Sequence, residues 1–417
     1  MKKVLITLLS VVVALVSCTS TSEKTSAPEP TEGFLHVQGQ DIVKPNGEKL
    51  YIQGTNLGNW MNPEGYMFGF QKTNSPHFIN EMFSQLVGPD AANEFWKAFK
   101  DNYITAADIH FIAEQGANTI RLPFHYKLFT DEDYMGLTSN QDGFARVDSV
   151  VKWCKNEGLY LILDMHDCPG GQTGDNIDDS YGYPWLITSK ASQDQFCEIW
   201  KKIAAYYVNE PTILGYELMN EAVATYFEKE YEMLFPKLEA LYRRGVEEIR
   251  TVDKNHIILL GGACWNSNFH CITDWSYDDN LMFTCHRYGG EPTAEAIQHY
   301  LDVQRTSNQP MYMGEFGHNT MEWQSNFVKT LKEHNIGYTF WPYKKVDDSC
   351  MMGVTRPEGW NEVVVAFSEA DRSTYAAVRE ARPDQEKALA LMQEYLKNIR
   401  FENCVPQTDY IQSMGLK

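Results

Sequence analysis

Short apolar runs alternate with longer amphipathic stretches along most of the chain, a pattern typical of strands alternating with helices. Two of the helical stretches are Phe144–Glu157 and Tyr231–Val252. Because strands separated by helices pair in parallel, eight such runs predict an α/β fold with one closed (β/α)8 barrel. The eight runs are Tyr51–Leu57, Ala117–Phe124, Leu159–His166, Ile213–Asn220, His256–Gly262, Leu281–His286, Met311–Glu315 and Gly337–Pro342.

The segments on either side of these runs predict additions to the barrel. Phe34–Val43 and Lys49–Gln53 flank a Pro-Asn-Gly turn, which indicates an N-terminal β-hairpin. Trp360–Phe367 and the strongly helical Pro383–Arg400 predict a C-terminal helical extension. No internal repeat is visible, so residues 33–417 are expected to form a single domain.

Two intervals between the predicted strands are much longer than the others. They are residues 58–116 and residues 167–211. Long connections that follow barrel strands often shape the site at the end of the barrel. We therefore expect both intervals to hold loops over such a site.

The first 32 residues are expected to lie outside this domain. Lys2 and Lys3 precede the apolar stretch Val4–Val16, which is shorter than a comfortable bilayer span and indicates a targeting segment. The stretch ends in LVSC, which resembles the lipobox of bacterial lipoproteins. The resemblance implies that residues 1–18 are a lipoprotein signal peptide and that Cys18 is acylated. Residues 19–32 are rich in Ser, Thr, Pro and Glu, and predict a disordered tether.

These features predict an exported lipoprotein, anchored in a membrane of the cell envelope on the periplasmic face or at the cell surface. Several acyl chains together give stable anchoring, whereas a single chain is marginal. The alternatives are an ordinary cleaved signal peptide and an uncleaved anchor.

The charge and composition narrow the class of ligand. The 417-residue chain has 36 Lys and Arg against 56 Asp and Glu, a formal net charge of -20, which argues against a nucleic-acid partner. The negative net charge fits a protein that acts on a neutral ligand better than one that binds a polyanion. The eight cysteines after Cys18 show no CxxC or Cys/His metal spacing and are expected to be free and buried. Oxidation of some of them in an exported protein stays open, and the sequence does not give the pairing. We expect no metal and no organic cofactor.

Polar residues gather where the predicted strands end, and catalytic groups of barrel enzymes lie at the C-terminal ends of the strands. Glu221 follows the fourth strand and Glu315 ends the seventh. Double-displacement glycoside hydrolysis requires two such acids, a proton donor and a nucleophile about 5 Å apart. The other polar or aromatic residues in or near strand ends are Asn56, Arg121, His166, Asn220, His286, Tyr288 and Trp341.

Seven segments together resemble the motifs of glycoside hydrolase family 5, a family of cellulases, mannanases and exo-β-1,3-glucanases. They cover roughly residues 50–345 in the family's order, and the first and third are similar to the exo-β-1,3-glucanase branch. The segments are GTNLGNW (54–60), NTIRLPFHY (118–126), DMHDCPGGQTGDN (164–176), ELMNEA (217–222), CHRY (285–288), MGEFG (313–317) and FWPYKK (340–345). The resemblance implies a TIM barrel.

The resemblance also implies roles in catalysis. Glu221 matches the acid/base, which must hold a proton at neutral pH and so needs a raised pKa from burial and a neighbouring acid. Glu315 matches the nucleophile, which must stay ionised. Arg121 would favour that ionisation by its charge. Tyr288 matches the tyrosine that hydrogen-bonds the nucleophile, and Asn220 matches the residue that binds the sugar 2-hydroxyl.

Other positions match residues that bind the cleaved sugar. His166 and His286 match the two histidines that line its subsite, and Trp341 matches the platform beneath it. Glu64 falls where the exo-glucanase branch has its acid for the hydroxyls of the non-reducing end. Asp175 falls on the loop that helps close that pocket.

The sequence departs from the family pattern around this pocket. Ala222 replaces the usual proline after the acid/base, and Asn59 stands where the branch has glycine. Asp167 and Cys168 stand where the branch has Gly-Ala. Because these changes surround the sugar, they bear on substrate choice and leave the two acids intact.

The favoured interpretation is a retaining glycoside hydrolase that cleaves β-glucosidic linkages in a β-glucan or its oligosaccharides, like an exo-β-1,3-glucanase or β-glucosidase. An endo-acting cellulase or β-mannanase stays open, as does a catalytically weak carbohydrate-binding protein. A metal-dependent barrel hydrolase could use Asp164 and His166. It would need a histidine pair on the first strand, and Tyr51–Gly58 has none.

Overall fold

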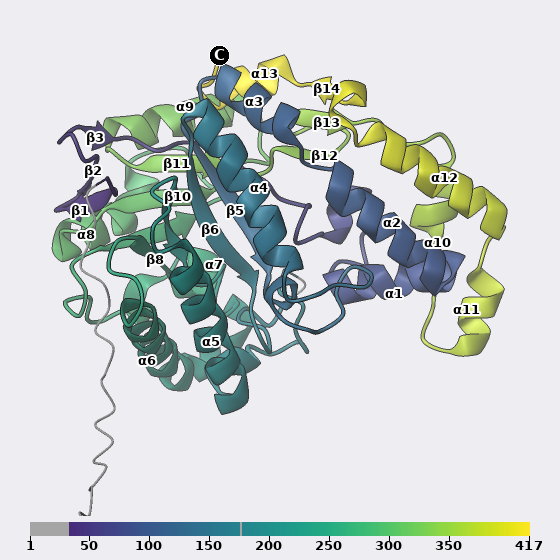
Figure 1. The fold of residues 1–417 in the computed structure, drawn as a ribbon, viewed down its shortest axis with the longest axis horizontal. Helices are drawn as coiled ribbons and strands as arrows, with labels where there is room; N and C mark the ends of the chain where they lie inside the picture. Colours follow the sequence, from purple (N-terminus) through teal and green to yellow (C-terminus); the bar gives the residue numbers. More distant parts are fainter. Residues whose placement is uncertain (1–32, 176) are drawn as a thin grey trace, which may run out of the picture.

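Eight parallel strands in the described part of the chain close into a barrel, which confirms the predicted (β/α)8 fold (Figure 1). The computed structural model describes residues 33–175 and 177–417, and the predictions for residues 1–32 fall outside it. The strands are β4 (Gln53–Asn56), β5 (Thr119–His125), β6 (Tyr160–Asp167), β7 (Ile213–Glu217), β8 (Ile257–Gly261), β9 (Leu281–His286), β10 (Met311–Glu315) and β11 (Gly337–Phe340).

Helices surround the strands and bury the outward-facing side chains of the barrel. The connection from β8 to β9 is an exception, because it contains only a single-turn helix and a 3-10 turn. The surrounding helices are α3 (Ala106–Glu114), α4 (Asp142–Glu157), α5 (Lys190–Tyr207), α6 (Tyr231–Arg250), α7 (Ala263–Asn266), α8 (Gln298–Ser307) and α9 (Met321–Glu333).

The N-terminal sheet closes the end of the barrel opposite to the site. It consists of β1 (His36–Gln38), β2 (Asp41–Val43) and β3 (Lys49–Leu50), joined in that order. The β2–β3 hairpin is the one predicted across the Pro-Asn-Gly turn, and the first predicted arm folds back on itself to give β1. Leu35 and Ile42 join a separate apolar cluster with inward-facing barrel residues such as Leu214, Leu259 and Tyr312.

The interval 58–116 begins with a mostly irregular stretch that brings Glu64 and Tyr66 to the site, as expected, and the rest of the interval is largely helical. It contains α1 (Pro76–Val87), α2 (Pro89–Asn102) and α3. In α1 the buried residues recur at helical spacing, and α1 and α2 pack with α12 (Gln385–Asn398) beside the barrel (Figure 1). Aromatic rings of Phe83, Trp96 and Tyr395 lie in the core of this lobe.

The C-terminal helical extension is confirmed and contains more elements than predicted. Besides α12 it includes α10 (Ala366–Glu369), α11 (Tyr375–Ala381) and α13 (Thr408–Ser413), with a π-helical segment Asn361–Val365. A small sheet of β12 (Lys344–Val346), β13 (Met352–Val354) and β14 (Val405–Pro406) ties the last residues to the chain that follows β11.

The eight cysteines of the described chain are free, as predicted; seven are buried and Cys404 is partly exposed. Within residues 33–175 and 177–417, no helix combines the length and the apolar character that crossing a bilayer requires.

Candidate active site

Arg121, on β5, is wholly buried in the barrel and binds carboxylates from three other strands. Its Nε and Nη2 donate to the two oxygens of Glu217 (2.8 and 2.7 Å), and its Nη1 donates to Glu315 Oε1 (2.7 Å). Asp164 Oδ2 lies 3.0 Å from Nη2. Burial disfavours the guanidinium charge, but these three acids hold the pKa of Arg121 well above its ordinary value.

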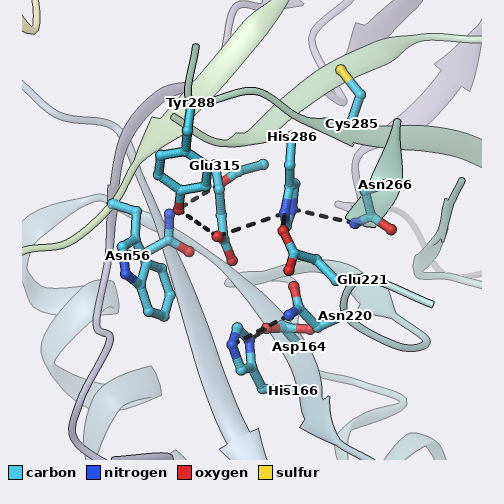
Figure 2. Close-up of polar contacts among 12 residues, drawn as sticks. Asn56, Asp164, His166, Asn220, Glu221, Asn266, Cys285, His286, Tyr288 and Glu315 are labelled. Atoms are coloured by element: carbon cyan, nitrogen blue, oxygen red, sulfur yellow. Dashed lines mark hydrogen bonds and ion pairs between the residues drawn. The ribbon is translucent and has the colours of Figure 1, made fainter. Parts of the chain in front are cut away.

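Glu315 is the last residue of β10, and both of its carboxylate oxygens accept hydrogen bonds. Arg121 donates to Oε1, and the Tyr288 hydroxyl donates to Oε2 at 2.6 Å. Tyr288 lies two residues beyond the end of β9. These two donors fix the orientation of the carboxylate, and Figure 2 shows the contact with Tyr288.

Glu221 lies four residues beyond the end of β7, since the strand ends at Glu217 and not at Asn220 as predicted. Its backbone is left-handed, with φ 41°, and Thr173 Oγ1 donates to its carbonyl oxygen at 2.6 Å. Burial is the main cause that raises the pKa of Glu221 to about 8, with the charges of nearby acids adding to it and Arg121 opposing it. This side chain is therefore protonated at neutral pH.

The two glutamates face each other across His286. One oxygen of Glu221, one oxygen of Glu315 and a ring nitrogen of His286 all lie within 4.8 Å of one another. His286 Nδ1 is 2.7 Å from Glu221 Oε1 and 3.6 Å from Glu315 Oε2 (Figure 2). Carboxyl groups about 5–5.5 Å apart belong to retaining glycosidases, whereas inverting enzymes need about 6.5–9.5 Å.

The same three side chains are also the one group of His, Cys, Asp and Glu in the described chain that is close enough to share a metal ion. An ion held there would bind one oxygen of each glutamate and a ring nitrogen of His286.

Both histidines of the site are held in one tautomer by side-chain amides. Asn266 Nδ2 donates to His286 Nε2 (3.2 Å), which leaves the His286 proton on Nδ1, facing Glu221. Asn220 Nδ2 donates to His166 Nε2 (3.3 Å), and His166 Nδ1 donates to Asp164. Burial lowers the pKa of His286 to about 4 and that of His166 to about 3, so both rings are neutral.

Trp341, Tyr66 and Glu64 lie together on the β11 and β4 side of the site. Trp341 directly follows β11, and its ring lies parallel to that of His166, with centroids 5.3 Å apart. Its Nε1 donates to the Tyr66 hydroxyl at 2.6 Å. Glu64 is only 6% exposed, and burial, followed by the charges of Glu315 and Glu221, raises its pKa.

Asp175 lies beside Glu221, on the loop that follows β6. Burial is the first cause that raises the pKa of Glu221, and the charge of Asp175 adds to it. The charge of Asp175 is the first cause that raises the pKa of Tyr226. The structure thus brings every predicted site residue from Glu64 to Trp341 to one end of the barrel.

Some residues of the site were not singled out from the sequence. Glu217 stood in an apolar run with no sign that its partner was Arg121. Gln172 lies in the segment 164–176, but the resemblance gave it no role. Its Nε2 donates hydrogen bonds to the backbone carbonyls of His166 and Asn220. Tyr66 and Asn266 could have been found only from their nearness to Trp341 and His286.

The comparisons with known sequences agree with this arrangement. Residues 78–346 match the sequence model of the family described as Cellulase (glycosyl hydrolase family 5). The chain is 27% identical over 362 residues to the beta-xylosidase of Phanerodontia chrysosporium, covering 78% of this chain and 73% of that protein. It is 26% identical over 316 residues to endoglucanase C of Acetivibrio thermocellus, covering 61% and 88%. A glucan 1,3-beta-glucosidase of Kluyveromyces lactis is 26% identical over 255 residues, covering 56% and 54%.

A solved structure supports the fold. The rutinosidase from Aspergillus niger superposes with a TM-score of 0.57 at 18% identity, covering 71% of this chain and 90% of that chain. The barrel and the sequence comparisons define an O-glycosyl hydrolase. The chain belongs to glycosyl hydrolase family 5, and the resemblance found from its motifs is confirmed.

Replacing Arg121 by leucine should destabilise the fold by about 3–5 kcal/mol at pH 7, because it leaves three buried carboxylates without their cation. Without Arg121 these carboxyls have raised pKa values, so the folded variant binds more protons than the unfolded chain. The deficit should therefore shrink as the pH falls. Urea unfolding of Arg121→Leu between pH 5 and pH 8 measures both effects.

The matched control is Arg305→Leu, which removes a cation from an exposed pair with Asp302. Exposed pairs contribute about 0–1 kcal/mol, so this variant should unfold like the wild type at every pH. Equal losses in the two variants, or a deficit for Arg121→Leu that does not depend on pH, would contradict the role given to the Arg121 charge.

Proposed function

We propose that this glycoside hydrolase releases β-linked glucose from the non-reducing end of a β-glucan or its oligosaccharides, with retention of anomeric configuration. The observation that carries the proposal is the carboxyl pair, with oxygens of Glu221 and Glu315 within 4.8 Å of each other in different surroundings. This spacing leaves no room for the water that an inverting enzyme holds between its acids.

The proposed first step breaks the glycosidic bond. Glu221, protonated because its pKa is raised to about 8, gives its proton to the glycosidic oxygen. The Glu315 carboxylate, oriented by Arg121 and Tyr288, attacks the anomeric carbon. The leaving group departs as a neutral alcohol, and the sugar remains as an ester on Glu315.

The second step returns the enzyme to its starting state. Glu221, now a carboxylate, takes a proton from a water molecule whose oxygen attacks the anomeric carbon from the side that the leaving group has left. The bond to Glu315 breaks, and this residue is again a carboxylate. The hydrogen bond from His286 Nδ1 supports Glu221 while it carries the negative charge.

A glucan as substrate is supported by the names of two relatives, a glucan 1,3-beta-glucosidase and an endoglucanase. Exo action is supported by Glu64, which is buried and close enough for its charge to act on Tyr66 and on the catalytic pair. A buried carboxyl group there can form hydrogen bonds with the hydroxyls of a terminal sugar and would block a longer chain.

Endo action is the second candidate, and the match to endoglucanase C over 88% of that protein favours it. An endo-acting enzyme needs room for sugars on both sides of the cleaved bond. The position of Glu64 is therefore the feature that separates the two candidates.

Glu221→Ala should reduce turnover of laminaribiose, whose leaving group is poor, by about 10²–10⁴-fold, because general acid catalysis is lost. It should affect the first step on 2,4-dinitrophenyl β-glucoside much less. In the wild-type enzyme the rate on laminaribiose should fall as the pH rises through about 8, where Glu221 loses its proton. Steady-state and burst kinetics on the two substrates from pH 5 to pH 10 measure these effects.

The contrasting variant is Glu315→Ala, which should lose turnover on both substrates, and azide should partly restore it with an α-glycosyl azide as the product. Unchanged turnover of laminaribiose by Glu221→Ala would remove Glu221 from the role of acid. A β-glycosyl azide from Glu315→Ala would reverse the two assignments.

Glu64→Ala should lower kcat/KM for the β-glucan by about 10- to 100-fold, the size expected for the loss of two hydrogen bonds of about 0.5–1.5 kcal/mol each. A second measurement follows the early products of the wild-type enzyme on laminarin, lichenan, carboxymethyl-cellulose and mannan. We expect monosaccharide as the early product, released from one of these four polymers. An early ladder of oligosaccharides would overturn exo action. Glu358→Ala, an exposed acid outside the site, serves as the control and should behave like the wild type.

We also propose that the protein is exported and anchored in the membrane through acylated Cys18, on the support of LVSC and the apolar stretch before it. Cys18→Ser should abolish incorporation of labelled fatty acid and move the protein from the membrane fraction to the soluble or uncleaved pool. Labelling that persists in Cys18→Ser would disprove this anchor.

A further inference from the structure

The turn that follows β8 contains the most unusual backbone of the described chain. Cys264, Trp265 and Asn266 have φ of 55°, 56° and 55°. Left-handed backbone is unfavourable for residues that carry a Cβ, and no other three consecutive non-glycine residues within 33–175 and 177–417 adopt it. Strain of this kind gathers at ligand sites, so the turn is a candidate for a function.

The turn gives two neighbouring side chains different surroundings. Asn266 is buried and reaches His286 (Figure 2), and Gly261 makes room for it, since a Cβ there would lie 2.2 Å from Asn266 Oδ1. Trp265 is partly exposed and packs edge-on against Tyr226, with ring centroids 5.5 Å apart. Because Tyr226 is 68% exposed, the pair presents aromatic surface to solvent.

Backbone contacts tie this aromatic pair to the proposed acid. The amide of Cys264 donates to the carbonyl of Val223 at 2.9 Å, two residues after Glu221. The hydroxyl of Tyr226 hydrogen-bonds Asp175, whose charge also acts on Glu221. Tyr226 and Trp265 therefore lie on the rim of the barrel next to Glu221.

The barrel topology places this pair across from the proposed pocket of the cleaved sugar. The strands follow one another as β4-β5-β6-β7-β8-β9-β10-β11, so β7 and β8 lie opposite β11 and β4. Trp341 follows β11, whereas Tyr226 and Trp265 follow β7 and β8. A glycosidic bond held at Glu221 and Glu315, with its cleaved sugar at Trp341, directs its other half toward the aromatic pair.

We propose that Tyr226 and Trp265 form the binding surface for the leaving group, and that this leaving group is a β-glucan segment of two or more sugars. The inference rests on the proposed function and specifies the other half of its substrate. Exposed aromatic surface beside a polar site is typical of ligand-binding grooves, and the flat faces of sugar rings fit such surfaces.

The length of the leaving group follows from a second set of rings. Phe227, next to Tyr226, contacts Tyr183 with centroids 5.2 Å apart, and Tyr183 contacts Trp185 at 4.6 Å. Trp185 is 47% exposed. Aromatic rings thus lie on the loop after β6 as well as on the loop after β7, and together they offer more surface than one sugar ring covers.

The test compares Trp265→Ala, Tyr226→Ala and the double variant on β-glucosyl fluoride and on laminaribiose, laminaritriose and laminaritetraose. Fluoride places no sugar on the leaving-group side, so its kcat/KM reports the site without any contact to a leaving-group sugar. In the wild-type enzyme kcat/KM should rise with oligosaccharide length. The ratio of kcat/KM for the tetrasaccharide to that for the fluoride should fall at least 10-fold in Trp265→Ala and further in the double variant.

The control variant is Tyr375→Ala, which removes an 87% exposed ring from α11 and should keep the wild-type ratio. An unchanged ratio in the double variant would overturn the inference and leave the proposed function intact. A parallel fall for fluoride and tetrasaccharide would also overturn it, because it would mean that the turn only supports His286. Failure of the wild-type enzyme on β-glucosyl, β-xylosyl and β-mannosyl fluoride would instead overturn the proposed function and this inference with it.

Discussion

The polar interior of this barrel depends on one buried cation. The Arg121 guanidinium contacts side chains from four other strands. It donates a hydrogen bond to Asn56 on β4 and pairs with the carboxylates of Asp164 on β6, Glu217 on β7 and Glu315 on β10. Each of these carboxylates alone would be very costly to bury, and the cation with its fixed hydrogen bonds offsets that cost. One positive charge nevertheless faces three acids. The site as a whole therefore has a surplus of negative charge, which favours proton uptake by the remaining carboxyls.

Two chemically identical side chains of the site have different surroundings. Glu315 has its two oxygens fixed by Arg121 and Tyr288, whereas Glu221 has a single neutral donor, His286. Burial, with the charges of the surrounding acids added to it, raises the pKa of Glu221 to about 8. Environments that separate the states of paired carboxyls are the general way in which one becomes an acid and the other a base or nucleophile.

The sequence predicted what depends on local pattern and missed what depends on distant partners. Strand periodicity placed His166 and Glu315 at strand ends because parallel strands bring those ends together. The same approach treated Glu217 as an ordinary strand residue, since nothing near it in sequence reveals Arg121, 96 positions away. Helix α1 is a different case. Its apolar residues recur at helical spacing from Ile79 to Leu86, and the length of the interval hid a pattern that was already present.

The two ends of the proposed cleft differ in the kind of surface that they offer. On the β11 and β4 side, Glu64, Tyr66 and Trp341 are a polar and aromatic group, in which Glu64 and Trp341 are buried. On the β7 and β8 side, Tyr226 is exposed and Trp265 is partly exposed, so this side presents aromatic rings to solvent. A cleft for internal cleavage would need two open ends. A buried acid at one end and exposed aromatic rings at the other fit the proposed exo action, in which the terminal sugar is held tightly and the rest of the chain loosely.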